Sequence, residues 1–142
     1  FFLGLFAHKA IGIKAPADLA GKSIAVTRGS VDDTELTKIA PAAAEVRRFE
    51  DNKATISAFL AGQTQLLATS AQVASTVMSR NPQLGTEDKF LLKDSPNFIG
   101  LAKGEDALRA RINEILADAK KSGELEKLSQ KWLGRSTGDL PE

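Results

Sequence analysis

Apolar residues recur along this chain with two periods, one typical of strands and one typical of helices. Residues 2–7 (FLGLFA) form a continuous apolar run of strand length, and residues 23–27 form a short β-branched run. Residues 31–39 have apolar side chains at helical spacing, with acids early and a lysine late, and Pro41 ends the pattern. Further strands are predicted at residues 45–49, 64–69, 90–92 and 98–102, and further helices at residues 52–61 and 71–80.

Two amphipathic helices are predicted at the end of the chain. The first ends at Gly123 and the second at Gly134, because glycine is favoured just past a helix C-terminus. Their apolar stripes consist of Leu108, Ile112, Ile115, Leu116 and Ala119, and of Leu125, Leu128, Trp132 and Leu133. Strands separated by helices of about ten residues also predict crossover connections. We therefore expect an α/β fold with a mostly parallel sheet and helices on both of its faces.

Composition excludes several classes of protein. The 142 residues carry nineteen Lys and Arg against eighteen Asp and Glu, a net charge of +1, which lacks the field of a nucleic-acid-binding or membrane-surface protein. The absence of cysteine excludes disulfides and zinc–thiolate sites. No apolar run approaches the roughly 20 residues that a membrane-spanning helix needs. The chain begins with Phe1, which indicates a processed or truncated protein or a piece of a longer one.

Two turns are candidate ligand sites, because ligands of such sheets bind where strands end and helices begin. The first turn contains Arg28, Gly29, Ser30 and Val31, and the second contains Thr69 and Ser70. A small anion is expected at the amides of Gly29, Ser30 and Val31, facing Ser70 and within reach of Arg28.

The first turn also has a purely structural interpretation. Ser30 and Asp33 match the capping-box spacing, in which the hydroxyl accepts a backbone N–H of the first helical turn. In the functional interpretation, Gly29 lets an anion approach the exposed amides and Ser30 adds a hydroxyl. Asp32 and Asp33 would repel a carboxylate there unless Arg28 offsets their charge.

Little in the sequence indicates catalysis. The single histidine, His8, lies at a predicted strand end without a recognisable nucleophile or metal partner. No phosphate-binding or dinucleotide-binding glycine motif occurs, and no cluster of histidines and acids has metal-ligand spacing. We therefore expect no enzyme, no cofactor and no metal site.

Four short motifs occur in an order that resembles one protein family. They are residues 18–30 (DLAGKSIAVTRGS), residues 58–63 (AFLAGQ), residues 93–100 (KDSPNFIG) and residues 123–134, which begin with GEL and end with KWLG. Together they resemble the polar amino-acid solute-binding proteins, the type II periplasmic receptors that deliver ligands to ABC importers. The similarity covers nearly the whole chain.

The resemblance implies a periplasmic-binding-protein-like II lobe and a periplasmic location. Residues 1–95 would be the second lobe with a connecting strand, and residues 96–142 a segment that returns to the first lobe as a strand and two helices. The implied partners are a small polar or anionic solute, such as an amino acid, and the membrane subunits of an ABC importer.

The chain departs from the family pattern in several places. The first part of the first lobe is missing from the sequence, and in the family it holds the arginine that binds an amino acid's carboxylate. Ser70 stands where many relatives place an aspartate for the ligand ammonium, Gln65 where an aspartate follows a turn, and Val31 where a hydroxyl residue is frequent. Loss of such charged partners predicts a weak half-site.

Three functions stay open at this point. The first is a solute-binding module, whole or truncated. The second is a truncated receptor lobe that has lost ligand binding and acts as a self-associating or interaction domain. The third is a dehydratase-like enzyme on the same fold, which the scarcity of acid and base candidates disfavours.

Two further expectations concern packing. The runs at residues 2–7 and 98–102 resemble the strands that connect the lobes, and we expect them side by side at the edge of the first domain. In the family the terminal helices pack against the first lobe, which favours a core position for Trp132 over a partner surface. Because most of that lobe is missing, we expect a homodimer in which residues after Pro96 carry most of the contact.

Overall fold

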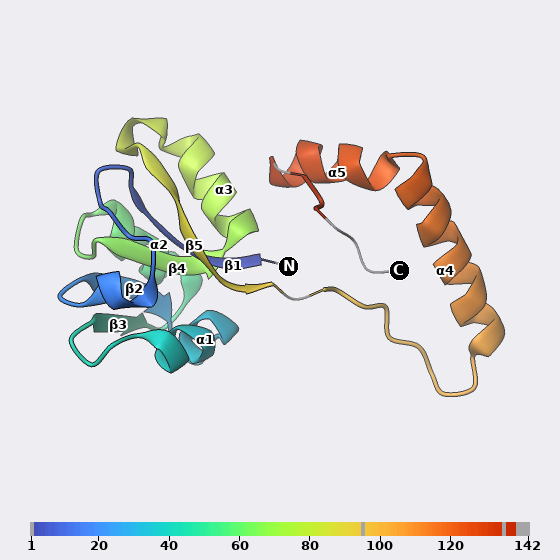
Figure 1. Cartoon of the computed structure of the whole chain (residues 1–142), viewed down its shortest axis with the longest axis horizontal. Coiled ribbons are helices and arrows are strands. Elements are labelled where there is room, and N and C mark those ends of the chain that lie inside the picture. Colours follow the sequence, from blue (N-terminus) through green and yellow to red (C-terminus); the bar gives the residue numbers. More distant parts are fainter. Residues whose placement is uncertain (1, 95, 135, 139–142) are drawn as a thin grey trace. The chain divides into compact units, whose positions relative to one another are not determined.

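The chain forms two compact units, Phe1–Ser95 and Pro96–Glu142. The computed structural model describes residues 2–94, 96–134 and 136–138. The first unit contains a sheet with helices, and the second contains helices (Figure 1). All the predicted ligand-binding residues belong to the first unit.

The first unit is built on one sheet of five strands in the order β3-β2-β4-β1-β5. The strands are β1 (Phe2–His8), β2 (Ser23–Thr27), β3 (Glu45–Phe49), β4 (Leu66–Ser70) and β5 (Thr86–Asp94). β2 pairs in parallel with β3 and β4, whereas β1 is antiparallel to its neighbours β4 and β5. Four of these five strands therefore run in one direction and β1 runs in the other.

The predicted α/β fold with a mostly parallel sheet is confirmed in the strand directions. The helices α1 (Val31–Ile39), α2 (Asn52–Leu60) and α3 (Ala71–Arg80) each join two strands of the same direction, as crossover connections do. A short 3-10 helix, η2 (Pro82–Leu84), follows α3. β1 is followed instead by a loop with one 3-10 helix, η1 (Pro16–Leu19). β1 lies between β4 and β5 and is antiparallel to both, so half of the strand pairings are antiparallel. The sequence pattern did not predict this arrangement.

Helices cover both faces of the sheet, as predicted. Side chains of neighbouring strand residues point to opposite faces, so each strand contributes to two cores. The core on the α1 side contains Leu5, Ile24, Val26, Leu36 and Leu66, and the core on the side of α2 and α3 contains Phe6, Ala25, Phe59, Leu67 and Ala74. These two cores fix the positions of the strand ends and of the helices that begin beside them.

Two expectations about the margin of the sheet are wrong. The strand predicted at residues 90–92 begins earlier, at Thr86, because β5 is an edge strand and tolerates the charged residues 87–89. The run at residues 2–7 does not lie at the edge. It forms β1, which has β4 on one side and β5 on the other.

Residues 98–102, predicted as a strand beside β1, are not a strand. β1 is paired on both sides along residues 3–7, so it has no free edge to offer. A strand needs a partner for its backbone N–H and C=O groups, and the described residues supply none for this segment. The returning strand expected in residues 96–142 is therefore absent from the described part of that segment.

The second unit contains the two predicted helices, α4 (Asp106–Lys121) and α5 (Glu124–Leu133). Gly123 and Gly134 flank α5 in the left-handed conformation, with φ of 76° and 66°. Among the described residues from 96 onward, no apolar side chain is fully buried, and Trp132 is 70% exposed. The expected core position of Trp132 is therefore wrong, because two helices alone cannot cover both of their apolar stripes.

Candidate functional site

The carboxyl ends of β2 and β4 lie at one edge of the sheet. The strands are parallel and pair Ala25 with Leu67, so Thr27 and Thr69, two residues further along, reach that edge together. α1, α2 and α3 begin at the same edge, because each follows a strand of the same direction. Each has a capping side chain that accepts a backbone N–H, and these are Ser30, Asp51 and Ser70. The structure thus brings the two predicted turns to one edge.

The turn between β2 and α1 is closed by two reciprocal hydrogen bonds. The Ser30 hydroxyl oxygen accepts the Asp33 N–H at 3.1 Å, and the Asp33 carboxylate accepts the Gly29 N–H at 3.0 Å. The capping role of Ser30 is therefore confirmed, while the return bond goes to Gly29. Gly29 has a φ of 69°, and a Cβ there would meet nothing within 4 Å. The backbone conformation, not crowding, requires this glycine.

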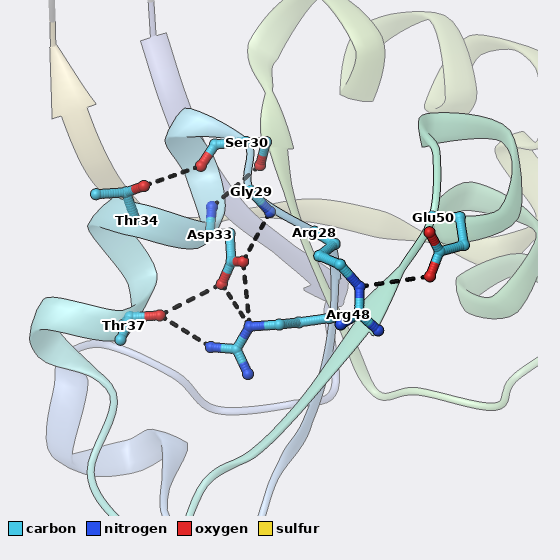
Figure 2. Close-up of polar contacts among 8 residues, drawn as sticks. All are labelled: Arg28, Gly29, Ser30, Asp33, Thr34, Thr37, Arg48 and Glu50. Carbon is cyan, nitrogen blue, oxygen red and sulfur yellow. Dashed lines mark hydrogen bonds and ion pairs between the residues drawn. The ribbon is translucent and has the colours of Figure 1, made fainter.

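Asp33 is also held from β3. Arg48 Nε lies 2.8 Å from Asp33 Oδ1 and 3.1 Å from Oδ2, and the Thr37 hydroxyl donates to Oδ1 at 3.3 Å. Arg48 Nη2 in turn donates to Thr37 at 3.0 Å. Figure 2 shows the Asp33 carboxylate between the Gly29 amide and the Arg48 guanidinium. Because Asp33 is only 8% exposed, it needs this compensating charge.

Sequence reasoning missed Arg48. It lies two residues after Val46, which packs against the α1 side of the sheet, so both side chains project toward α1. That signal becomes useful only once β3 is known to lie beside β2, where Arg48 pairs with Val26.

Arg28 has a different partner from the one considered at the sequence level. Its Nε lies 3.4 Å from Glu50 Oε1, and both side chains are exposed. Its backbone N–H donates to the Phe49 carbonyl at 2.8 Å and ties the turn to the end of β3. Arg48, rather than Arg28, offsets the charge of Asp33. The Arg28 side chain is held by one weak surface pair (Figure 2).

Asp32 is the second carboxylate of the turn. Burial raises the pKa of its carboxyl, whereas its own backbone N–H and the Ser30 hydroxyl act in the opposite direction. Its Oδ1 atom is buried and has no hydrogen-bond partner in the described part of the chain. Val31 beside it is half exposed. The first turn of α1 therefore combines one exposed apolar side chain with one partly buried acid.

Thr69 and Ser70 form the second predicted turn. Thr69 is buried and pairs with Gly4 of β1, and Ser70 pairs with Leu3. The Ser70 hydroxyl oxygen accepts the Val73 N–H at 3.4 Å, which is long for such a bond. Ser70 is therefore a helix cap whose hydroxyl is weakly engaged.

The sequence analysis also did not predict a polar cluster that lies next to these turns. The Thr27 hydroxyl donates to Asn52 Oδ1 at 2.6 Å and lies 2.8 Å from the Thr55 hydroxyl, which reaches the Asp51 carbonyl at 2.7 Å. It joins the end of β2 to the start of α2. Threonine and asparagine at such positions form no distinctive sequence pattern, so only the structure reveals the cluster.

Other parts of the molecule offer less chemistry. A groove of about 390 Å³ lies between α2 and α3, and its lining includes Ile56, Val73 and Arg80 but no residue of the β2–α1 turn. No histidines and acids of the described residues gather in a group that could hold a metal ion. None of the helices in the described ranges is long and apolar enough to cross a membrane.

Known proteins are similar to this chain in sequence and in fold. The sequence profile of the bacterial extracellular solute-binding proteins, family 3, matches residues 9–135. The chain belongs to this family. The match includes both predicted turns and most of the second unit, and it confirms the resemblance that the four short motifs indicated.

Individual relatives agree with this assignment. The chain is 27% identical over 130 residues to an ABC transporter glutamine-binding protein of Bacillus subtilis, covering 91% of this chain and 47% of that protein. An ancestral arginine-binding protein bound to glutamine is 27% identical with a TM-score of 0.67, over 94% of this chain and 60% of that one.

A third similarity concerns the fold alone. The open, unliganded L-cystine solute receptor of Neisseria gonorrhoeae has a TM-score of 0.76 at 19% identity, over 98% of this chain and 59% of that one. The predicted periplasmic-binding-protein-like II fold is thereby confirmed. The chain spans about half the length of the curated relative it matches.

Proposed function

We propose that this chain is the substrate-binding component of an amino-acid ABC importer, or a part of it, and that it binds a small polar or anionic solute. The observation that carries the proposal is the convergence of the β2–α1 turn and Ser70 at one edge of the sheet in a family-3 chain. Relatives named for glutamine and arginine binding supply the ligand class, an α-amino acid.

In this proposal the ligand carboxylate lies at the amides of Gly29, Ser30 and Val31. The N-terminus of α1 favours an anion there by about 1–2 kcal/mol at best. The Ser30 N–H donates to the Thr27 carbonyl at 3.2 Å and the Gly29 N–H to Asp33, so the ligand must compete for both. This competition is consistent with a weak half-site.

Side chains around the turn complete the proposed site. Arg28, whose Nε lies 3.4 Å from Glu50 in an exposed pair, turns toward the ligand carboxylate. Ser70 offers its weakly engaged hydroxyl to the ligand ammonium, and Thr69 orients this strand end. A neutral hydroxyl binds an ammonium less strongly than an aspartate does, so the half-site is weaker than that of a relative with an acid.

We also propose that the chain acts by binding, without catalysis and without a cofactor. The family consists of solute-binding proteins, and two carboxylates beside the turn, Asp33 and Glu50, are each paired with an arginine. A carboxylate in an ion pair is a poor general base. The third carboxylate, that of Asp32, has no ion pair among the described residues, but the turn contains no histidine beside it. The dehydratase-like alternative requires turnover of a cyclic acid substrate, which a product assay detects directly.

The proposed location is the periplasm, and the proposed protein partners are the membrane subunits of an ABC importer. Support comes from the family's extracellular members and from the relative named as part of an ABC transporter. Under this proposal residues 1–95 are the second lobe with its connecting strand, and residues 96–142 are the segment that returns to the first lobe.

A second proposal concerns self-association. The helices α4 and α5 leave large apolar side chains exposed, among them Ile115, Leu128 and Trp132. Burying such a side chain contributes about 1.5–3 kcal/mol, so several together favour a covering surface strongly. We propose that a second copy supplies it, in a homodimer formed through residues after Pro96, because a two-fold axis lets one stripe cover another.

A calorimetric titration with a panel of amino acids tests the ligand proposal. We expect saturable binding of at least one amino acid by the whole chain, weakened several-fold by Arg28→Ala. Arg80→Ala is the matched control, because Arg80 lies in the last turn of α3, at the opposite end from Ser70. Absence of binding across the panel overturns the proposal. Equal affinity of Arg28→Ala and wild type removes Arg28 from the site.

A further inference from the structure

A carboxylate of the chain itself occupies the amide that the proposed ligand carboxylate needs. Asp33 Oδ2 accepts the Gly29 N–H at 3.0 Å from the first turn of α1. The Asp33 side chain is only 11% exposed, so it is fixed beside the turn instead of extending into solvent. The Gly29 N–H that would donate to a ligand anion therefore already donates to the Asp33 carboxylate.

Arg48 and Thr37 give Asp33 partners that do not depend on Gly29. If the Gly29 bond breaks, Asp33 Oδ1 keeps Arg48 Nε at 2.8 Å and the Thr37 hydroxyl at 3.3 Å. Arg48 Nε also lies 3.1 Å from Oδ2, the atom that bonds Gly29. Release of the Gly29 N–H therefore leaves the Asp33 carboxylate with partners. A buried carboxylate without a partner would make the rearrangement costly.

We propose that Asp33 is an internal occupant of the anion subsite and that Arg48 holds Asp33 when a ligand carboxylate takes the Gly29 N–H. This inference rests on the proposed function, since it concerns how that ligand gains its subsite. Asp33 and the ligand compete for one amide, so the observed Kd equals the intrinsic Kd divided by the fraction of chains with Gly29 released. Asp33 sets the affinity, and Arg48 is a positioning residue.

The first test removes the competitor without changing the net charge. We expect the double variant Asp33→Ala, Arg48→Ala to bind L-glutamine or L-arginine about 10- to 150-fold more tightly than wild type, as loss of one competing charged hydrogen bond predicts. The double variant Glu45→Ala, Arg47→Ala is the matched control. It removes the neighbouring ion pair of β3, 2.7 Å apart, and is expected to leave the affinity unchanged.

Two single variants separate the roles of the pair. Arg48→Met deprives Asp33 of its alternative partner and leaves its charge uncompensated, so we expect weaker binding of the same amino acids. Asp33→Asn keeps an oxygen that accepts the Gly29 N–H but removes the charge, so we expect binding between that of wild type and that of the double variant. Asp33→Asn also keeps the proposal testable if the double variant does not fold.

The amide resonance of Gly29 reports the competition without relying on affinity. We expect its proton shift to move upfield in the Asp33→Ala, Arg48→Ala variant, where the carboxylate bond is lost, and to return downfield on titration with acetate. A merely structural cap predicts no saturable acetate response at Gly29.

The outcomes separate this inference from the proposed function. Tighter amino-acid binding by the double variant, with a saturable response at Gly29, supports it. If wild type binds an amino acid and the folded double variant binds it equally or more weakly, the inference is overturned and the proposed function stands. If neither wild type nor any folded variant binds an amino acid, both are overturned.

Discussion

The Lys93 ammonium of β5 lies 3.1 Å from the Glu35 carboxylate of α1, which also accepts a hydrogen bond from Lys38 at 2.9 Å. Glu35 therefore ties α1, which forms one side of the proposed site, to the last strand of the sheet. The contact spans 58 positions of the sequence, so it forms only when the whole first unit is folded.

This relationship predicts a pH dependence of stability. Hydrogen bonds from Lys38 and then Lys93 hold the pKa of the Glu35 carboxyl below its usual 4.5. A carboxyl whose pKa is lowered by folding contributes stability above its unfolded pKa and loses it as the pH falls through the folded pKa. We expect Glu35→Gln to lower the thermal midpoint at pH 7, and the difference from wild type to shrink as the pH falls below 4.5.

Thermal unfolding followed by circular dichroism between pH 7 and pH 3 checks this. Glu45→Gln is the control, because the Glu45 carboxylate pairs with Arg47 on the exposed surface and little change is expected. A Glu35→Gln difference that stays constant into acid contradicts the prediction.

The core beneath α1 predicts a large contrast between two neighbouring apolar residues. Leu36 is fully buried against the sheet, whereas Val31 is 52% exposed in the first turn. We expect Leu36→Ala to lower the free energy of unfolding by about 2–5 kcal/mol, and Val31→Ala by less than about 0.5 kcal/mol. Urea denaturation of both variants measures the contrast. Similar losses for the two would place Val31 in a core.

Local signals predicted much of the fold. Residues 31–39 and 71–80 are helices with the predicted bounds, because a serine begins each one and a proline follows each one closely. The sequence pattern of 98–102 is as strand-like as that of 2–7, but only the latter finds partners on both sides. Whether a strand forms depends on tertiary pairing, which the local sequence does not encode.

The candidate site was predictable to the same extent. Because ligands bind where strands end, the sequence predicted that Gly29, Ser30 and Ser70 lie at one edge of the sheet, and the structure has them there. The capping-box spacing also predicted the bond of the Ser30 hydroxyl correctly. The bonds from Arg48 to Asp33 were not predictable, because they depend on β3 lying beside β2.

Glu126 of α5 accepts hydrogen bonds from Thr137, which follows that helix in the chain. Its carboxylate accepts a hydrogen bond from Gln130 at 3.0 Å, and from the Thr137 N–H at 3.0 Å and the Thr137 hydroxyl at 2.9 Å. These bonds, that from Gln130 being the largest influence, lower the pKa of Glu126 to about 2. The hydrogen bonds between the Glu126 carboxylate and Thr137 are therefore intact at neutral pH, and they weaken as the pH falls from about 4.5 toward 2.

We expect Glu126→Gln to speed hydrogen exchange of the Thr137 amide at neutral pH, because the amide loses its charged acceptor. Exchange of the Thr55 amide of α2, which donates to the carbonyl of the capping residue Asp51, serves as the internal control. Equal rates of Thr137 amide exchange in wild type and variant contradict a stabilising role of the Glu126–Thr137 hydrogen bonds.

The apolar stripe of the second unit predicts self-association. We expect sedimentation at micromolar concentration to show a dimer, and acrylamide quenching of Trp132 to decrease as the concentration rises. Leu128→Gln is expected to weaken the dimer, whereas Lys127→Gln, at the neighbouring exposed position, is expected to leave it intact. A monomer at these concentrations, with quenching of Trp132 that does not change with concentration, overturns the homodimer.

The central claim is that the carboxyl edge of β2 and β4 binds an amino acid. Its most direct test is an NMR titration of backbone amides with L-glutamine and with L-arginine. The account predicts saturable shifts at Gly29, Ser30, Val31 and Ser70, with at most small changes at residues 106–121 of α4. Shifts confined to the second unit, or no saturable shift with either amino acid, would contradict it.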